Sequence, residues 1–216
     1  MGHLFRDRRD AGRVLARKLD TYAGRQDLLV LALPRGGAPV AFEVARALGA
    51  PLDVFLVRKL GVPGFEERAF GAIASGGVRV LDSEMMRQAR ISEAAVVTAT
   101  HRELDELVRR EELYRSGRGP LAVHGRTVVL VDDGLATGAS MRAAVQALRM
   151  MGPAAIVVAV PVAPAEACQE LSYVADDVVC AATPRPFRNV GEWYGDFSQL
   201  SDDEVVRLLA EAAGGV

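Results

Sequence analysis

The residues whose types and spacing best suggest chemistry lie between Val128 and Ser140 (VVLVDDGLATGAS). Four apolar residues, typical of a buried strand, are followed by two acids, Asp132 and Asp133. Adjacent carboxylates repel each other, so two of them at a strand end gain most when they meet hydroxyl donors or a cation. The diol of a ribose offers two such donors at a matching separation, and hydrogen bonds to ionised groups are strong.

The residues that follow the two acids are small and open the next expected helix. Free N–H groups at the start of a helix favour an anion through geometry and dipole, and small residues let the backbone approach it closely. We therefore expect a phosphate group to bind there. The predicted phosphate loop consists of Gly134, Leu135, Ala136, Thr137, Gly138, Ala139 and Ser140. The alternative is a plain strand–turn–helix in which an Asp or Thr caps the helix.

Two further segments carry positive charge directly after expected strands. Leu33–Gly37 places Arg35, Gly36 and Gly37 after the first apolar run, where a guanidinium and bare backbone N–H groups suit a pyrophosphate. Taken alone, this stretch could equally be a simple turn. The second segment is 58–64, and its Lys59 is one of only two lysines in the chain, against 24 arginines. All three segments follow strands, so a parallel sheet would bring them to one edge.

The segment 128–140 closely resembles the phosphoribosyl-pyrophosphate (PRPP) signature of the type I phosphoribosyltransferases. That signature is four hydrophobic residues, two acids, three variable positions and Thr-Gly-x-Thr/Ser. Leu33–Gly37 is similar to the pyrophosphate loop of the family, most of all its adenine-type form. The stretch 58–64 resembles the Arg-Lys-x-Gly-x-x-Pro of the adenine-type enzymes, although Val62 stands where a second lysine is common. That departure weakens an assignment to adenine.

The resemblance implies a role for each segment. Asp132 and Asp133 would hold the ribose 2- and 3-hydroxyls and contact Mg²⁺ indirectly, and the phosphate loop would hold the 5-phosphate. Arg35 and Lys59 would be the catalytic groups that contact pyrophosphate, together with the N–H groups of Gly36 and Gly37. The resemblance also implies a cis non-proline peptide at or beside Pro34–Arg35.

The implied reaction transfers the 5-phosphoribosyl group from Mg²⁺-bound PRPP to a nitrogen heterocycle, purine-like by preference, and releases pyrophosphate. The alternative is a non-catalytic regulator that senses PRPP or a nucleotide on the same fold. A third reading, another α/β nucleotide-binding protein, would require the three segments to converge by accident. A homodimer is one expectation for the assembly.

Two carboxylates and an aromatic cluster are further candidates. Residues 61–76 contain Gly and Pro and are predicted to form a loop that could close as a lid and exclude water. Glu66 or Glu67 within it could exchange a proton with the acceptor, or both could be solvated loop acids. Near the end of the chain, Trp193 and Phe187 could stack on a flat base, or they could complete the hydrophobic core.

The periodicity of the whole chain predicts an α/β fold with a mainly parallel central sheet flanked by helices, of the type I phosphoribosyltransferase kind. Apolar runs predict strands, and amphipathic stretches between them predict helices. Residues 58–67 are expected to form a loop, and 70–74 with 78–81 a hairpin. The expected strands cover 28–33, 52–57, 127–132, 155–160 and 178–181, and the expected helices cover 7–22, 39–48, 82–90, 92–115, 140–151, 164–171 and the end of the chain.

The expected organisation is a single domain over residues 1–216 with a helical insertion at about 82–120. A C-terminal segment at about 185–216 and a small variable hood complete it. The 216 residues carry 26 basic and 28 acidic side chains, and 50% of the chain is hydrophobic. That balance is typical of a folded globular domain and argues against disorder and against a basic nucleic-acid-binding surface.

The remaining features of the sequence suggest a cytoplasmic location. No apolar signal segment follows the first residues, and the most apolar stretch, 154–165, has 12 residues and two prolines, too few to span a bilayer. We therefore expect neither a membrane nor a nucleic acid as partner. The two cysteines, Cys168 and Cys180, are expected to be free, inert core residues in a reducing compartment.

Overall fold

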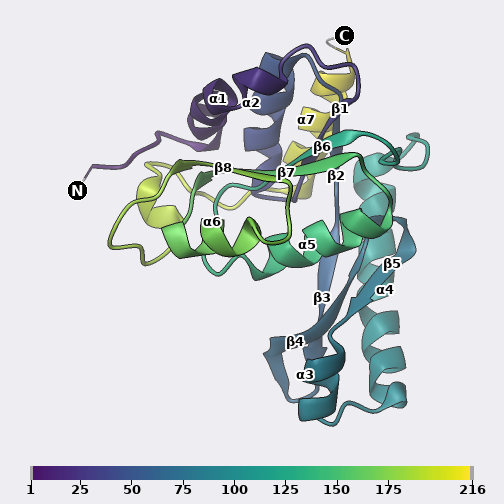
Figure 1. Cartoon of the computed structure of the whole chain (residues 1–216). Helices are drawn as coiled ribbons and strands as arrows, with labels where there is room; N and C mark the ends of the chain where they lie inside the picture. Colours follow the sequence, from purple (N-terminus) through teal and green to yellow (C-terminus); the bar gives the residue numbers. More distant parts are fainter. Residues whose placement is uncertain (1, 215–216) are drawn as a thin grey trace.

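Five parallel strands form the central sheet of the protein in the computed structural model, which describes residues 2–214 (Figure 1). Their order in the sheet is β2-β1-β6-β7-β8, and every pair is parallel. This confirms the predicted fold class. The strands are β1 (Leu28–Ala32), β2 (Leu52–Val54), β6 (Thr127–Val131), β7 (Ala155–Val162) and β8 (Asp177–Ala182).

Helices cover both faces of this sheet because its strands are apolar on both sides. Alternate residues of β1 point to opposite faces, so that Val30 packs in one core cluster and Leu31 in the other. On the first face lie α1 (Arg8–Lys18), α2 (Gly37–Leu48) and α7 (Asp202–Gly214) (Figure 1). On the second lie α5 (Ala139–Met150) and α6 (Ala165–Leu171).

A second, antiparallel sheet projects away from the central one and forms the hood of the fold (Figure 1). Its strands pair in the order β3-β4-β5, and the β4–β5 pair confirms the predicted hairpin. Two helices pack with this sheet, the second of them long. The elements are β3 (Val57–Val62), β4 (Phe65–Ala74), β5 (Val78–Leu81), α3 (Ser83–Gln88) and α4 (Glu93–Arg115).

The expectation of a loop over residues 58–67 is wrong, and so is that of a loop-like lid over 61–76. Gly61 interrupted the strand pattern, but the antiparallel pair absorbs it in a shift of register. Pro63 and Gly64 form a two-residue turn between β3 and β4, in which Gly64 has a φ of 77°. The residues that suggested a loop therefore build the turn of a hairpin.

A segment near the N-terminus lies beside the segment that precedes α7 and pairs with it through its backbone. The N–H groups of Leu4 and Phe5 both donate to the carbonyl of Trp193, at 2.9 and 3.0 Å. In return, Gly195 donates to the carbonyl of Phe5 at 2.8 Å. We call residues 4–8 and 193–198 the terminal strap. Short 3₁₀ turns at Asp20–Tyr22, Ser75–Gly77 and Gly191–Trp193 complete the secondary structure.

The expectation of two free cysteines is also wrong. Cys168 in α6 and Cys180 in β8 are joined by a disulfide bond. Both are half-buried, and nothing in their spacing indicated that a short helix would bring them together. Among residues 2–214, no helix has the length and apolar character needed to cross a bilayer.

Candidate active site

The candidate site lies where the strand order of the central sheet reverses. From β1 the chain passes through α2 to β2 on one side, whereas β6 pairs with β1 on the other side. The loops that follow β1 and β6 therefore diverge at the carboxyl ends of two neighbouring strands. Such a switch point is the usual place of a ligand-binding crevice in open α/β sheets. These two loops are Leu33–Gly37 and the segment that begins with Asp132.

Two glycines let the loop after β1 lie directly against the acidic pair. A Cβ atom placed on Gly36 would lie 2.2 Å from Asp133 Oδ2, and one placed on Gly37 would lie 2.7 Å from the carbonyl oxygen of Val131. No side chain fits at either distance. The peptide between Pro34 and Arg35 is cis, at the position that the family resemblance implied. The structure thus brings the first two of the three predicted segments together.

Each acid of the pair has one oxygen bonded within the protein and one that is not. Asp132 Oδ1 accepts from the N–H of Asp133 at 2.8 Å, and Asp133 Oδ2 accepts from Arg8 Nε at 2.8 Å. Asp132 Oδ2 and Asp133 Oδ1 accept no hydrogen bond from the described residues, and neither oxygen is fully buried. Both therefore reach solvent, and two carboxylate oxygens remain for a ligand.

The pair is largely enclosed, which raises the energy of its charges. Burial, and after it the charge of Asp133, raises the pKa of Asp132 well above its usual value. Burial likewise raises the pKa of Asp133, and the Arg8 guanidinium opposes that rise. Paired hydroxyl donors or a cation would relieve this cost.

Two residues of the terminal strap hold Asp133, and sequence reasoning missed both. Arg8 bonds its carboxylate, and the Tyr194 hydroxyl donates to its main-chain carbonyl oxygen at 2.5 Å. Burial raises the pKa of Tyr194 above its usual value, so that the hydroxyl stays a neutral donor. Arg8 was one of 24 arginines and lies 125 positions from Asp133. No local signal could have singled it out.

The predicted phosphate loop is open where a phosphate would approach it. Gly138 precedes α5 with a φ of 69°, and no side chain caps the free N–H groups of the first turn, apart from a long contact of 3.4 Å between Ala139 N and Thr137 Oγ1. Ala136, Thr137 and Ser140 are exposed and Ala139 is partly so, whereas Gly134, Leu135 and Gly138 are buried. A Cβ on Gly134 would lie 2.5 Å from Val190 Cγ1, so the loop is fixed from behind.

Arg35 belongs to the loop that lies against the acidic pair, and its side chain faces α7. Its Nη1 lies 3.9 Å from Asp202 Oδ1, and the same oxygen accepts a hydrogen bond from the hydroxyl of Tyr114 in α4. About a third of the Arg35 side chain is exposed. The guanidinium is thus held loosely at the rim of the crevice, within a network from three elements.

Lys59 is exposed on β3 and approaches the phosphate loop from the hood. It lines a cavity of about 350 Å³ together with Arg102 and Ser140, the last residue of that loop. Its neighbour Arg58 is engaged elsewhere, because its Nη2 lies 2.7 Å from Glu103 of α4. The third predicted segment therefore lies near Ser140, at the end of the phosphate loop and not at the acidic pair that precedes this loop.

The remaining candidates are two carboxylates and two aromatic residues, and the structure describes only the aromatic side chains. Glu66 and Glu67 lie in β4, but their side chains are outside the described part of the structure. Trp193 is 7% exposed and packs against Phe187, with ring centroids 6.1 Å apart, in a cluster that includes Phe5 and Val162. This burial favours the core alternative, and the stacking role of Trp193 and Phe187 stays an untested prediction.

The donor chemistry of the acidic pair fits Mg²⁺. Magnesium prefers oxygen ligands and is commonly held by one or two carboxylates together with substrate phosphates. Asp132 Oδ2 and Asp133 Oδ1 provide two such oxygens. Within residues 2–214, no group of three or more potential ligands forms a protein-only metal site.

Comparison with known proteins defines the class. The model of the phosphoribosyl transferase domain family matches residues 6–192, and the chain belongs to that family. A crystal structure of the protein TT1426 from Thermus thermophilus is similar at 47% identity with a TM-score of 0.86. The match covers 96% of this chain and 98% of that one.

The chain also resembles longer curated proteins. Proteins of Mycobacterium tuberculosis strains CDC 1551 and H37Rv, both named provisionally as phosphoribosyl transferases, are 50% identical to it over 209 residues. The match covers 97% of this chain and 47% of theirs. The chain thus spans about half the length of these relatives.

Proposed function

We propose that the protein transfers the 5-phosphoribosyl group of PRPP to a ring nitrogen of a heterocycle, purine-like by preference, and releases pyrophosphate. In this reaction the bond from C1 of the ribose to the pyrophosphate oxygen breaks, and a bond from C1 to the acceptor nitrogen forms. The nitrogen loses its proton, and the electron pair of the broken bond leaves with pyrophosphate. C1 becomes cationic as this bond stretches, and the leaving group gains negative charge.

Orientation of the sugar is the first task of the site. The free oxygens of Asp132 and Asp133 would accept from the 2- and 3-hydroxyls, and the N–H groups at the start of α5 would hold the 5-phosphate. Contacts at both ends of the ribose fix the direction in which C1 faces. Such positioning removes much of the entropic part of the barrier.

Stabilisation of the leaving group is the second task. Arg35 would contact pyrophosphate, with the N–H group of Gly36 beside it, and Lys59 would reach it from the hood. The N–H of Gly37, also expected to bind pyrophosphate, instead donates to the carbonyl of Leu33 at 3.0 Å. Bound Mg²⁺ would add a positive charge to the departing phosphates. Glu66 and Glu67 remain the candidates for the proton on the acceptor nitrogen.

The observation that carries this proposal is the contact between the two loops at the switch point. The Gly36 backbone lies so close to Asp133 that no side chain fits between them. The loop Leu33–Gly37 and the acidic pair are therefore in contact at the carboxyl edge of the sheet, and the open start of α5 follows the pair by six residues. A plain strand–turn–helix would need neither two accessible carboxylate oxygens nor a bare glycine loop against them.

The test combines binding with turnover. Calorimetry with PRPP and Mg²⁺ should detect binding by the wild-type protein, and none by Asp132→Asn/Asp133→Asn. The matched control Asp105→Asn, on the exposed face of α4, should bind as the wild type does. Circular dichroism checks that all variants fold. Absence of binding by the wild type at millimolar PRPP would contradict the proposal.

Pyrophosphate release with a panel of purine and other nitrogen bases then decides between enzyme and regulator. Release with at least one base supports the transferase. Binding of PRPP without release on any base would favour the sensing role, and the acidic pair would then serve recognition alone.

A further inference from the structure

We propose that Arg8 is a positioning residue that presents the acidic pair to the ribose diol. This inference deepens the proposed function and rests on it. Arg8 is the first residue of α1 and lies outside the three predicted segments. Its Nε donates to Asp133 Oδ2 at 2.8 Å, which fixes the carboxylate and leaves its other oxygen, Oδ1, without a hydrogen bond from the described residues. Without this bond, the carboxylate could rotate and its two oxygens would be equivalent.

The guanidinium of Arg8 is held on three sides, so its position is defined before any ligand arrives. Beside the bond to Asp133, Nη1 donates to the carbonyl of Ser198 at 2.8 Å. The Phe197 ring lies beneath it, with the centroid 3.9 Å from the guanidinium carbon. Only 11% of the side chain is exposed. Both of these further partners belong to the terminal strap.

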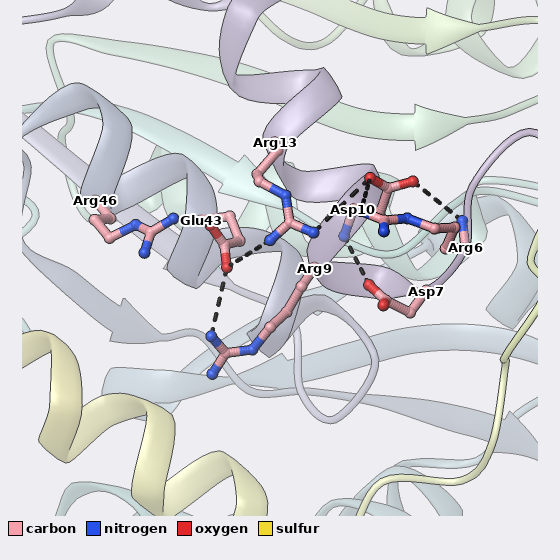
Figure 2. Close-up of polar contacts among 7 residues, drawn as sticks. All are labelled: Arg6, Asp7, Arg9, Asp10, Arg13, Glu43 and Arg46. Carbon is pink, nitrogen blue, oxygen red and sulfur yellow. Dashed lines mark hydrogen bonds and ion pairs between the residues drawn. The ribbon is translucent and has the colours of Figure 1, made fainter.

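The helix that carries Arg8 is itself fixed to the body of the protein. The Asp7 side chain caps α1 by accepting from the N–H of Asp10 at 2.7 Å (Figure 2). Arg9 and Arg13 reach across to the buried carboxylate of Glu43 in α2, at 3.5 and 3.4 Å (Figure 2).

Close packing adds to these ion pairs. A Cβ on Gly12 would lie 2.7 Å from the carbonyl oxygen of Val40, so α1 and α2 pack with their backbones in near contact. Arg8 therefore projects from a firmly placed helix start and not from a mobile chain end.

The charge of the acidic pair also favours a cation beside it. Two adjacent, largely enclosed carboxylates would carry a charge of −2, and Arg8 is the cation that bonds one of them within the described residues. It leaves a net charge of −1 and one accessible oxygen on each acid. That arrangement suits two neighbouring hydroxyl donors. We therefore expect Arg8 to control the preference for a diol more than the affinity for the phosphate.

The test measures that preference with ribose 5-phosphate against its 2-deoxy and 3-deoxy analogues, because Asp133 Oδ1 would hold only one of the two hydroxyls. The wild type should prefer ribose 5-phosphate over each analogue by roughly 10-fold or more, as expected for a hydrogen bond to a charged group. Arg8→Ala should lower the affinity for ribose 5-phosphate by a similar factor and leave that for one analogue, the one that lacks the hydroxyl held by Asp133, nearly unchanged. The preference over that analogue should thus fall toward one.

Two variants separate positioning from general support of the fold. Arg13→Ala breaks contacts between α1 and α2 without touching Asp133, so it should lower the melting temperature and keep the preference. Arg8→Lys keeps the charge but not the two-nitrogen geometry, and should restore the preference in part. If Arg8→Ala does not fold, Arg8→Lys carries the test, and its unchanged preference would overturn the inference.

The outcomes distinguish this inference from the proposed function. A wild-type protein that binds PRPP and prefers the diol, with Arg8 variants that prefer it equally, would overturn the role of Arg8 alone. A wild-type protein that binds neither PRPP nor ribose 5-phosphate would overturn both.

Discussion

Glycine at two positions sets the geometry of the crevice at the level of single residues. Gly36 and Gly37 have no side chain to separate the loop after β1 from Asp133 and from the carbonyl of Val131. The sequence shows them only as part of a turn. The residues that they contact lie about a hundred positions further along the chain. Only this tertiary contact explains why both positions need glycine.

Gly36→Ala should therefore damage the site directly. Its Cβ would meet Asp133 Oδ2 at 2.2 Å, so either the loop or the carboxylate must move. We expect a loss of about 1–3 kcal/mol in the free energy of unfolding, typical of overpacking, and loss of PRPP binding. Chemical denaturation and calorimetry measure the two effects. Gly119→Ala, where an added Cβ meets nothing within 4 Å, is the matched control and should change neither.

Asp132→Asn should stabilise the protein while it removes PRPP binding. Burial raises the pKa of Asp132 in the folded state, so its ionised form destabilises the fold at pH values above that pKa. At pH 7 the melting temperature should rise, by about 2–4 °C for each kcal/mol relieved. The gain should disappear below the usual carboxyl pKa of 3.8, where both states are protonated. An unchanged or lower melting temperature at pH 7 would contradict this account.

Lys59→Ala should weaken the binding of pyrophosphate and leave the fold intact. Lys59 is exposed, and the loss of a charged contact to a phosphate costs roughly 10-fold or more in affinity. Lys18→Ala removes the other lysine, exposed at the end of α1, and should have no effect. Titration calorimetry with Mg²⁺ and pyrophosphate compares the two. Equal affinities would show that Lys59 does not contact the ligand.

At the scale of elements, the hood shows how local signals can mislead. Gly and Pro in residues 58–67 favour a loop when each is considered alone. Pairing with β4 supplies hydrogen bonds that the isolated segment lacks, so the strand forms with an irregular register at Gly61. The long helix α4 then supports the hood through Glu103, which is 8% exposed and bonds both Arg58 and Arg102.

Glu103→Ala should loosen the hood against α4. Removal of one partner from a largely buried charged pair leaves the other without compensation, but Arg58 is a third exposed, so water can replace part of the bond. We expect a loss of about 1–2 kcal/mol in stability. Urea denaturation measures it, with Glu112→Ala on the exposed side of the same helix as the control. A loss of the same size in both variants would mean that the pair does not support the hood.

At the scale of the whole molecule, binding at the switch point links elements that are far apart in the chain. The ligand would touch loops after β1 and β6 and the start of α5, and Arg8 and Tyr194 connect the acidic pair to the terminal strap. A ligand that binds only the folded arrangement stabilises all of it by mass action.

PRPP with Mg²⁺ should accordingly raise the melting temperature of the whole protein. At a concentration of 100 times the dissociation constant, the gain is about 2.7 kcal/mol. That corresponds to roughly 5–11 °C for a chain of this size. Differential scanning calorimetry should show one shifted transition. A shift confined to part of a split transition would mean that the hood or the strap unfolds independently of the site.

The amino-acid sequence alone determined the mainly parallel central sheet flanked by helices, and the acidic and glycine-rich motif of the phosphoribosyl transferase domain family. These features are local, because hydrophobic periodicity and turn residues act over a few neighbours. The hairpin at Pro63–Gly64, the disulfide between Cys168 and Cys180, and the approach of Arg8 to Asp133 were decided only by the tertiary structure. The hairpin needs the hydrogen bonds of its partner strand β4, and the other two contacts depend on how separate segments of the chain pack, which no local pattern records.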